Sequence, residues 1–287
     1  MTTLATRTTP RAAAVAMVVT GAFCQPSGAA VAGLLFPRAG ALGMVMLRLA
    51  FSAILLAITC RPRWRGHTRA DWLVIVGFGL ALATMNTLFY LAVARIPLGA
   101  AVTFEVLGPL VLAVATTRRW LWATLALAGV ATLSRAGLTT GLDLPGVAFA
   151  LGAGAMWAAY IVLSQRTAGR FPKTDGLALA LVVAAVATLP LGLSTAGQAL
   201  ADPVVLGLGL VVAVLSSALP YSLELRALRT LPAGTFAVLM CLTPAIATVV
   251  GFAVLGQALT LVEAAATALV VTASIGAVRA RPPSREG

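Results

Sequence analysis

The stretch FEVLGP, residues 104–109, contains Glu105, the residue best placed to do chemistry in this sequence. The carboxylate stands in a long apolar run, and the positions four residues before and after it are Ala101 and Pro109. An ionisable group in so apolar a segment is costly and usually faces a cavity or a charged partner. Pro109 removes a backbone donor and crowds the carbonyl group of Glu105, which loosens the helix beside the carboxylate. We expect Glu105 to meet a substrate or to exchange a proton.

Arg48 offers the competing explanation of Glu105. It follows Gly40 by eight residues and Glu105 follows Leu98 by seven, so the two lie ~12 Å and ~10 Å along their helices from the same side. A buried ion pair between them, with a purely architectural role, therefore stays open beside the substrate or proton role. The sequence does not say whether the two helices touch.

Other polar and aromatic side chains share helical faces and form a candidate lining for a small-molecule path. Such residues usually face the interior of a helical bundle, although many only bond neighbouring helices. Glu224 lies close to Arg226 and Arg229, so an interfacial charge cluster is an equal alternative to a coupling role. The candidates are Gln25, Asn86, Tyr90, Trp157, Tyr160 and Tyr221 for substrate, Arg48 and Glu224 for an ion pair or coupling, and Pro109 and Pro244 for helix bends.

The elements that must position these residues are helices long enough to cross a bilayer. The chain has 287 residues, of which 60% are hydrophobic and 10% charged, whereas a soluble protein is about half apolar and a quarter charged. A spanning helix needs about 20 apolar residues, and the alternation typical of spanning strands is absent. We predict an all-α, polytopic membrane protein with ten spans at residues 13–35, 40–60, 72–94, 98–117, 120–137, 145–165, 176–195, 203–225, 231–253 and 259–278.

The formal charge of +12 is explained by membrane orientation rather than by a nucleic-acid partner. With the N-terminus in the cytoplasm, sixteen of the 20 Lys and Arg residues fall in inner segments. Arg38, Arg95 and Arg135 fall outside, and Arg48 lies within a span. This bias follows the positive-inside rule, so we expect both termini in the cytoplasm and no nucleic-acid binding.

An internal repeat relates the two halves of the chain. The fourth predicted span begins with Pro-x-Gly and carries a second proline twelve residues after the first, and the ninth does the same. Because five spans is an odd number, the second copy would enter the membrane from the opposite side, as in many secondary transporters. We expect two five-helix repeats, residues 1–140 and 141–287. The matched pairs, 135 positions apart, are Pro97 and Pro232, Gly99 and Gly234, and Pro109 and Pro244.

Motifs for other classes of protein are missing. The single histidine, His67, lies in a basic loop, and the sequence has no H-E-x-x-H or G-x-S-x-G motif of a hydrolase. It has no G-x-x-x-x-G-K-[ST] loop for ATP, and its three cysteines have no metal-ligand spacing. We expect no enzyme activity, no cofactor and no metal; a non-transporting membrane assembly protein is the remaining alternative to a carrier.

Over nearly its whole length the chain resembles the EamA-type branch of the drug/metabolite transporter superfamily, and within it the threonine/homoserine exporter (Rht-type) family. The resemblance implies a ten-span inner-membrane carrier, a monomer or homodimer, that exports small neutral amino acids or, alternatively, other small metabolites or drugs. The strings that carry it are LFP (35–37), LRLA (47–50), MNTLFYLA (85–92), IPLGAAVTFEVLGPL (96–110), TTRR (116–119), ALGAGAMWAAYIVLSQRTAG (150–169) and SSALPYSLELRALRTLP (216–232).

Two positions depart from the family's pattern. Where family members have an acid before the proline of the ninth span, this chain has Thr243. Where they have Gly-Glu after that span, it has Gly256 and Gln257. The departures leave Glu105 as the main membrane carboxylate of the outer half.

Overall fold

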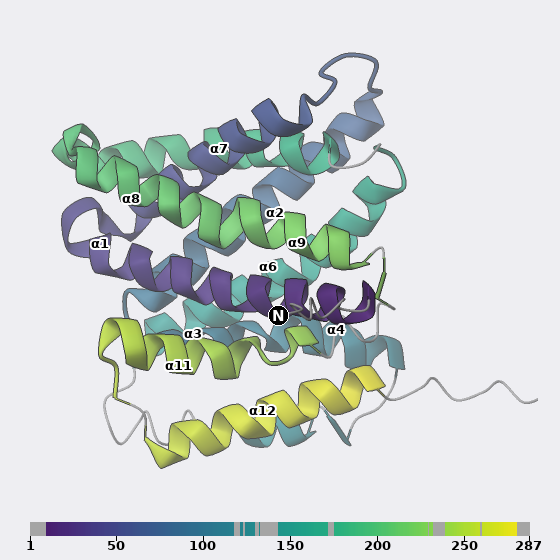
Figure 1. Cartoon of the computed structure of the whole chain (residues 1–287), viewed down its shortest axis with the longest axis vertical. Helices are drawn as coiled ribbons and strands as arrows, with labels where there is room; N and C mark the ends of the chain where they lie inside the picture. The colour runs from purple at the N-terminus through teal and green to yellow at the C-terminus, as the bar shows by residue number, and fades with distance from the viewer. Residues whose placement is uncertain are drawn as a thin grey trace, which may run out of the picture.

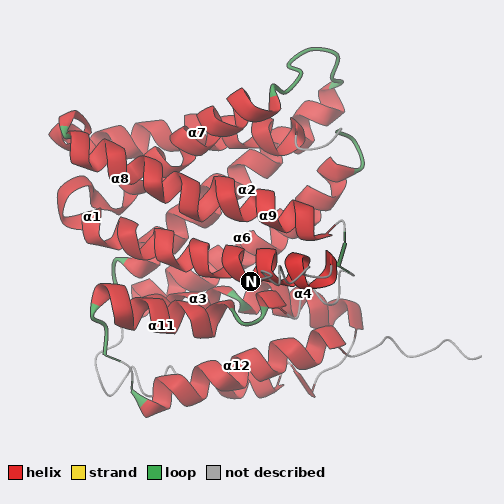
Figure 2. Cartoon of the chain, viewed as in Figure 1, coloured by secondary structure: helices red, strands yellow, loops and turns green. Residues whose placement is uncertain are grey.

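The structure, a computed structural model, is built from helices. It describes residues 10–117, 121–122, 124–129, 132, 143–171, 175–228, 230–231, 239–258 and 260–279. Within these ranges the regular structure is helical and contains no strand (Figure 2). The predicted all-α class is therefore confirmed. By length and hydropathy, four of the described helices could cross a membrane, and shorter apolar helices accompany them.

The first two predicted spans form the two arms of α1 (Pro10–Cys60), which meet at Gly40. Gly40 has φ 70° and ψ 162°, a conformation that side chains other than glycine rarely adopt. The chain reverses there, and the second arm runs back beside the first (Figure 1). This break falls at the predicted start of the second span.

The third and fourth spans are α2 (Arg69–Val93) and the pair α3 (Leu98–Glu105) and α4 (Leu107–Thr117). Val106 separates α3 from α4, three residues before Pro109. A proline cannot donate a hydrogen bond to the carbonyl four residues earlier, which here is that of Glu105. The interruption thus follows from the proline that the sequence places in this span.

In the second half, α6 (Leu144–Ala168) and α7 (Asp175–Ala196) match the sixth and seventh predicted spans. The eighth span is continuous but changes type, from α8 (Pro203–Ala213) through the π-helical turn η2 (Val214–Ala218) to α9 (Leu219–Leu228). The last two are represented by α11 (Thr243–Leu255) and α12 (Leu261–Arg279). Half of the fifth predicted span and residues 232–238 of the ninth, which include Pro232 and Gly234, lie outside the described residues.

The helix interruption in the first half has a counterpart in the second. Residues 239–240 are helical, 241–242 form a turn, and α11 begins at Thr243 with Pro244 in its first turn. At the offset of 135 residues, Val106 corresponds to Cys241 and Pro109 to Pro244. The two helix interruptions therefore lie at positions that the predicted sequence repeat makes equivalent.

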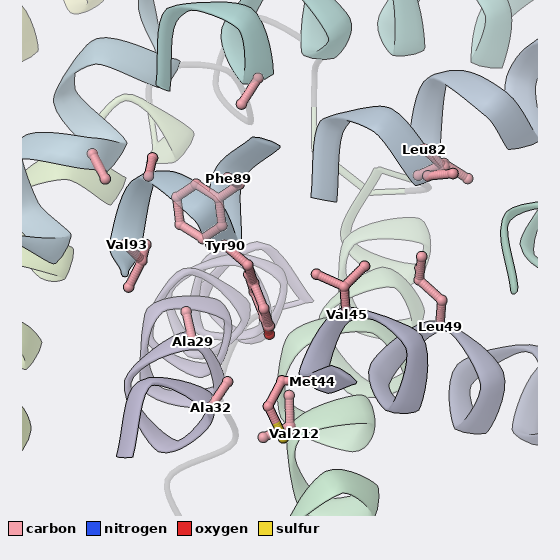
Figure 3. Packing of buried hydrophobic residues seen from close by; sticks show 14 of the residues in the cluster. Ala29, Ala32, Met44, Val45, Leu49, Leu82, Phe89, Tyr90, Val93 and Val212 are labelled. Carbon is pink, nitrogen blue, oxygen red and sulfur yellow. The ribbon is translucent and has the colours of Figure 1, made fainter. Parts of the chain in front are cut away.

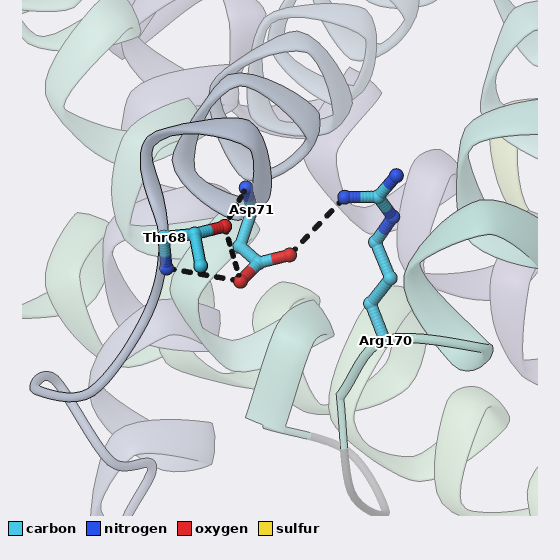
Figure 4. A network of polar contacts seen from close by, with 3 residues as sticks. All are labelled: Thr68, Asp71 and Arg170. Atoms are coloured by element: carbon cyan, nitrogen blue, oxygen red, sulfur yellow. Dashed lines mark hydrogen bonds and ion pairs between the residues drawn. The ribbon is translucent and has the colours of Figure 1, made fainter.

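Polar caps and ion pairs lie at the helix ends. Thr68 and Asp71 form a reciprocal capping box at the start of α2, and Asp71 also pairs with Arg170 at 3.2 Å (Figure 4). Similar pairs join Arg95 to Asp143 at 2.9 Å and Arg38 to Asp202 at 3.8 Å. In the predicted topology the first pair lies on the inner side and the other two on the outer side.

Small side chains allow the helices to pack closely around a core centred on α1, α2 and α7. Tyr90 of α2 is fully buried and reaches between the two arms of α1, with Ala29 and Ala32 on one arm and Met44 on the other (Figure 3). Leucine, valine and phenylalanine side chains are exposed on many helices, including α7, α8 and α11. Exposed apolar side chains on this scale are expected of a surface that faces lipid.

Candidate functional site

A buried guanidinium lies at the centre of the candidate site. Arg48, on the second arm of α1, is 7% exposed. Its Nη2 donates to the carbonyl oxygen of Ser216 at 2.9 Å, and its Nε donates to the hydroxyl of Ser217 at 3.3 Å. Arginine carries five N–H donors, and no carboxylate of the described residues forms an ion pair with Arg48. A buried positive charge is thus held by neutral groups.

The ring of Tyr90 lies under this guanidinium. The carbon at the centre of the Arg48 guanidinium is 5.5 Å from the ring centroid, within range of a cation–π contact. Phe36 and Phe89 flank the ring at centroid distances of 5.7 Å and 6.0 Å. The hydroxyl of Tyr90 is buried and has no hydrogen-bond partner in the described part of the chain.

The groups that bind Arg48 come from the π-helical turn η2. Single π-helical turns inside α-helices occur frequently at functional sites. The hydroxyl of Ser216 donates to the carbonyl of Gln25 on the first arm of α1, at 3.5 Å. Gly28, on the same arm, packs so closely on Ser216 that an added Cβ would collide with the hydroxyl. Both arms of α1 therefore meet at this turn.

Glu105 is the last residue of α3 and is partly buried. Within the described residues its carboxylate takes part in no hydrogen bond or ion pair, including any with Arg48. The direct Arg48–Glu105 pair that the sequence left open is not formed.

The backbone of Glu105 packs against α6. A Cβ added to Gly154 would collide with the carbonyl oxygen of Glu105, and one added to Gly108 would collide with the carbonyl of Gly154. Ala150, one turn earlier in α6, is fully buried, and Gly146 faces Ile96 and Arg95. The small residues of α6 thus bring its backbone against the interruption between α3 and α4.

Of the other residues predicted for the substrate path or for coupling, the structure describes the side chains of four. Asn86 is buried and donates to the Leu82 carbonyl of its own helix at 2.8 Å, so its amide is used locally. Tyr160 is partly buried, with its ring 5.3 Å from that of Phe78. Trp157 and Gln25 are also partly buried. For Tyr221 and Glu224 the structure describes only a helical backbone in α9.

Three contacts of these helices were not predicted from the sequence. The role of the Ser216 carbonyl depends on the π-helical turn, which local periodicity does not reveal; the Ser-Ser pair before Pro220 was the available signal. Gln257 was noted only as a departure from the family. Its side-chain oxygen accepts from the backbone N–H of Leu98 at 2.9 Å and so caps the start of α3. Thr243, the other departure, donates to the carbonyl of Met240 at 2.6 Å.

The chemistry available here is binding of small charged molecules. The carboxylate of Glu105 lies beside the helix interruption at Val106, and the guanidinium of Arg48 is held by the π-helical turn η2. Exposed helix carbonyls at membrane depth are typical of substrate paths. Among the described residues, no group of three His, Cys, Asp or Glu side chains could hold a metal ion.

The chain is similar to proteins of a known family. Residues 144–279 match the model of the EamA-like transporter family. A threonine/homoserine exporter, RhtA, of Salmonella typhimurium (strain SL1344) is 43% identical over 255 residues, which is 87% of this chain and 86% of the relative. RhtA of Escherichia coli (strain K12) is 42% identical over 254 residues, which is 87% of this chain and 85% of the relative.

The fold is also similar to that of a protein of known crystal structure. The TM-score is 0.57, and the match covers 96% of this chain and 99% of the other chain at 19% identity. At that identity the similarity concerns the fold alone.

Proposed function

Because the chain belongs to the EamA-like transporter family, we propose that it is a secondary transporter that exports small neutral amino acids of the threonine and homoserine type. The observation that carries this proposal is the 43% identity, across 87% of the chain, to a protein named for that activity. A match of this extent leaves little of the chain for a separate function.

We propose ten spans in two inverted repeats, residues 1–140 and 141–287, in the inner membrane with both termini in the cytoplasm. Three observations support this architecture. The helix interruptions at Val106 and Cys241 are 135 residues apart. The family model matches 144–279, which is nearly the whole second repeat. Each ion pair joins two residues that the topology assigns to one side of the membrane.

In the proposed mechanism, Glu105 attracts the substrate ammonium or exchanges a proton, and it lies where α3 ends. Inverted repeats alternate access by rocking around a site near the midplane. The interruptions before Pro109 and Pro244 provide each repeat with a place to bend, because the helix hydrogen bonds there are already broken. With no ATP-binding loop in the sequence, an ion or substrate gradient would drive export.

The test is export from cells loaded in parallel with threonine, homoserine, other amino acids and unrelated drugs. Expression of the chain, against an empty-vector control, should accelerate efflux of the small neutral amino acids. If only drugs are exported, the amino-acid substrate is wrong and the alternative, an exporter of drugs or other small metabolites, is correct. No efflux of any compound by normally inserted protein would overturn the exporter proposal.

A further inference from the structure

Arg48 lies deep within a helix, yet no carboxylate of the described residues pairs with it. It is about eight residues, or ~12 Å, along the helix from the reversal at Gly40. A buried guanidinium usually requires an acidic partner, because neutral acceptors only partly replace water. The structure provides one backbone carbonyl and one serine hydroxyl, on Ser216 and Ser217. Within the described part of the chain, this site therefore lacks an acceptor with negative charge.

Tyr90 supplies a second donor beside the first. Its ring lies under the Arg48 guanidinium, and its fully buried hydroxyl has no partner among the described residues. Buried hydroxyl groups are nearly always hydrogen-bonded, so a missing partner is informative. A guanidinium and a phenol next to each other form a donor pair that a carboxylate can accept, through charge-assisted hydrogen bonds.

We propose that Arg48 and Tyr90, with Ser217, form the subsite that binds the α-carboxylate of the substrate. This inference rests on the proposed export function and specifies its substrate class as zwitterionic α-amino acids. A bound carboxylate would accept from the Nη groups of Arg48 and from the Tyr90 hydroxyl. The π-helical turn η2 already holds the guanidinium through Ser216 and Ser217, so this donor group is oriented before the substrate arrives.

Glu105 provides a group that could bind the ammonium of an amino-acid substrate. Its carboxyl group has the opposite charge to Arg48 when it is ionised, and it forms no direct ion pair with Arg48. An amino acid offers an ammonium to one of these groups and a carboxylate to the other. Amines without a carboxylate would leave Arg48 and Tyr90 unpaired, and this mismatch selects against them.

The experiment measures competition against labelled L-threonine efflux from proteoliposomes containing the full chain. The competitors are unlabelled L-threonine and L-threoninol, in which a CH₂OH group replaces the carboxylate. Wild-type protein should prefer L-threonine by about tenfold or more, the value of one charge-assisted hydrogen bond. Tyr90→Phe should raise the KM for L-threonine and reduce that preference, as should Arg48→Lys, which keeps the charge but loses the planar fork.

Thr188→Val is the matched control, because it also removes a buried hydroxyl, one that bonds only within α7. It should keep the wild-type preference. If wild-type protein moves L-threonine but competes equally with L-threoninol, or if Tyr90→Phe and Arg48→Lys keep the full preference, the subsite is wrong and the export function stands. If wild-type protein moves no amino acid, the export function itself is wrong.

Discussion

Gly154 of α6 lies directly against the carbonyl oxygen of Glu105, so a single methyl group at position 154 would collide with that oxygen. We expect Gly154→Ala to lower the free energy of unfolding by about 1–3 kcal/mol, the usual cost of overpacking. Gly207→Ala is the control, since a Cβ there meets nothing within 4 Å, and alanine favours a helix over glycine. Thermal unfolding in detergent should separate the two; equal melting temperatures would refute the tight contact.

Glu105→Gln removes the charge of the carboxylate while keeping its size. If Glu105 binds the ammonium group or a proton, L-threonine efflux should fall about tenfold or more, since a hydrogen bond to a charged group is lost. Asp202→Asn serves as control because it also removes one carboxylate, while asparagine still caps α8. Efflux by Glu105→Gln at the wild-type rate, with equal membrane insertion, would reject this role.

Gln257 is expected to stabilise the start of α3. Its side-chain oxygen accepts the N–H of Leu98, one of the donors that a helix start leaves without a partner. Gln257→Leu should therefore destabilise the protein by about 1 kcal/mol, as loss of a cap usually does. Gln257→Glu keeps an oxygen at this position and should stay close to wild type in its melting temperature. If Gln257→Leu melts like Gln257→Glu, the hydrogen bond contributes nothing.

Asp143 is expected to make stability depend on acid pH. The Arg95 guanidinium and then the Gly146 N–H hold the pKa of the Asp143 carboxyl below its usual value. The ionised form is thus favoured in the folded chain, which stabilises the fold at pH above the unfolded pKa of about 3.9. This contribution is lost as the pH falls through the lower pKa of the folded chain.

The matched variant for this prediction is Asp143→Asn, which still caps α6 but cannot pair with Arg95 as a charge. Melting temperatures are compared from pH 7 downward. The advantage of wild type over the variant should be constant between about pH 7 and 5 and shrink below about pH 4. An advantage that grows on acidification would contradict the assignment.

The proposed orientation can be tested with cysteines placed in loops at opposite ends of the helices, after the native cysteines are replaced. Ala201 and Arg65 are both exposed. Because positive loops stay inside, a membrane-impermeant maleimide should label Ala201→Cys in intact cells and Arg65→Cys only after permeabilisation. The reverse pattern would invert the topology.

The sequence predicted the helices well because the membrane constrains their length and polarity. The predicted spans 145–165 and 176–195 correspond to Leu144–Ala168 and Asp175–Ala196. The helix caps at Asp143, Asp202 and Thr260 can also be predicted from the sequence, because each depends only on residues two or three positions away. The break near Pro109 was predictable because proline acts on its own helix.

The candidate site was harder to predict from the sequence because its contacts join residues that are far apart in the chain. Arg48 binds Ser216 and Ser217, which are 168 and 169 residues away in the sequence. Depth along the helices suggested Glu105 as its partner, but depth does not determine which faces meet. The π-helical turn that exposes the Ser216 carbonyl has no counterpart in hydrophobic periodicity.

The contact of α6 with α3 and α4 also bears on how the two halves can move. Gly154 packs directly on the backbone of Glu105 and Gly108, so backbone rests on backbone there. Large interdigitated side chains would have to leave their rotamers before one helix could shift past another. A contact without large side chains has no such barrier, so we expect α6 to shift past α3 and α4 during a transport cycle without changes of side-chain rotamer.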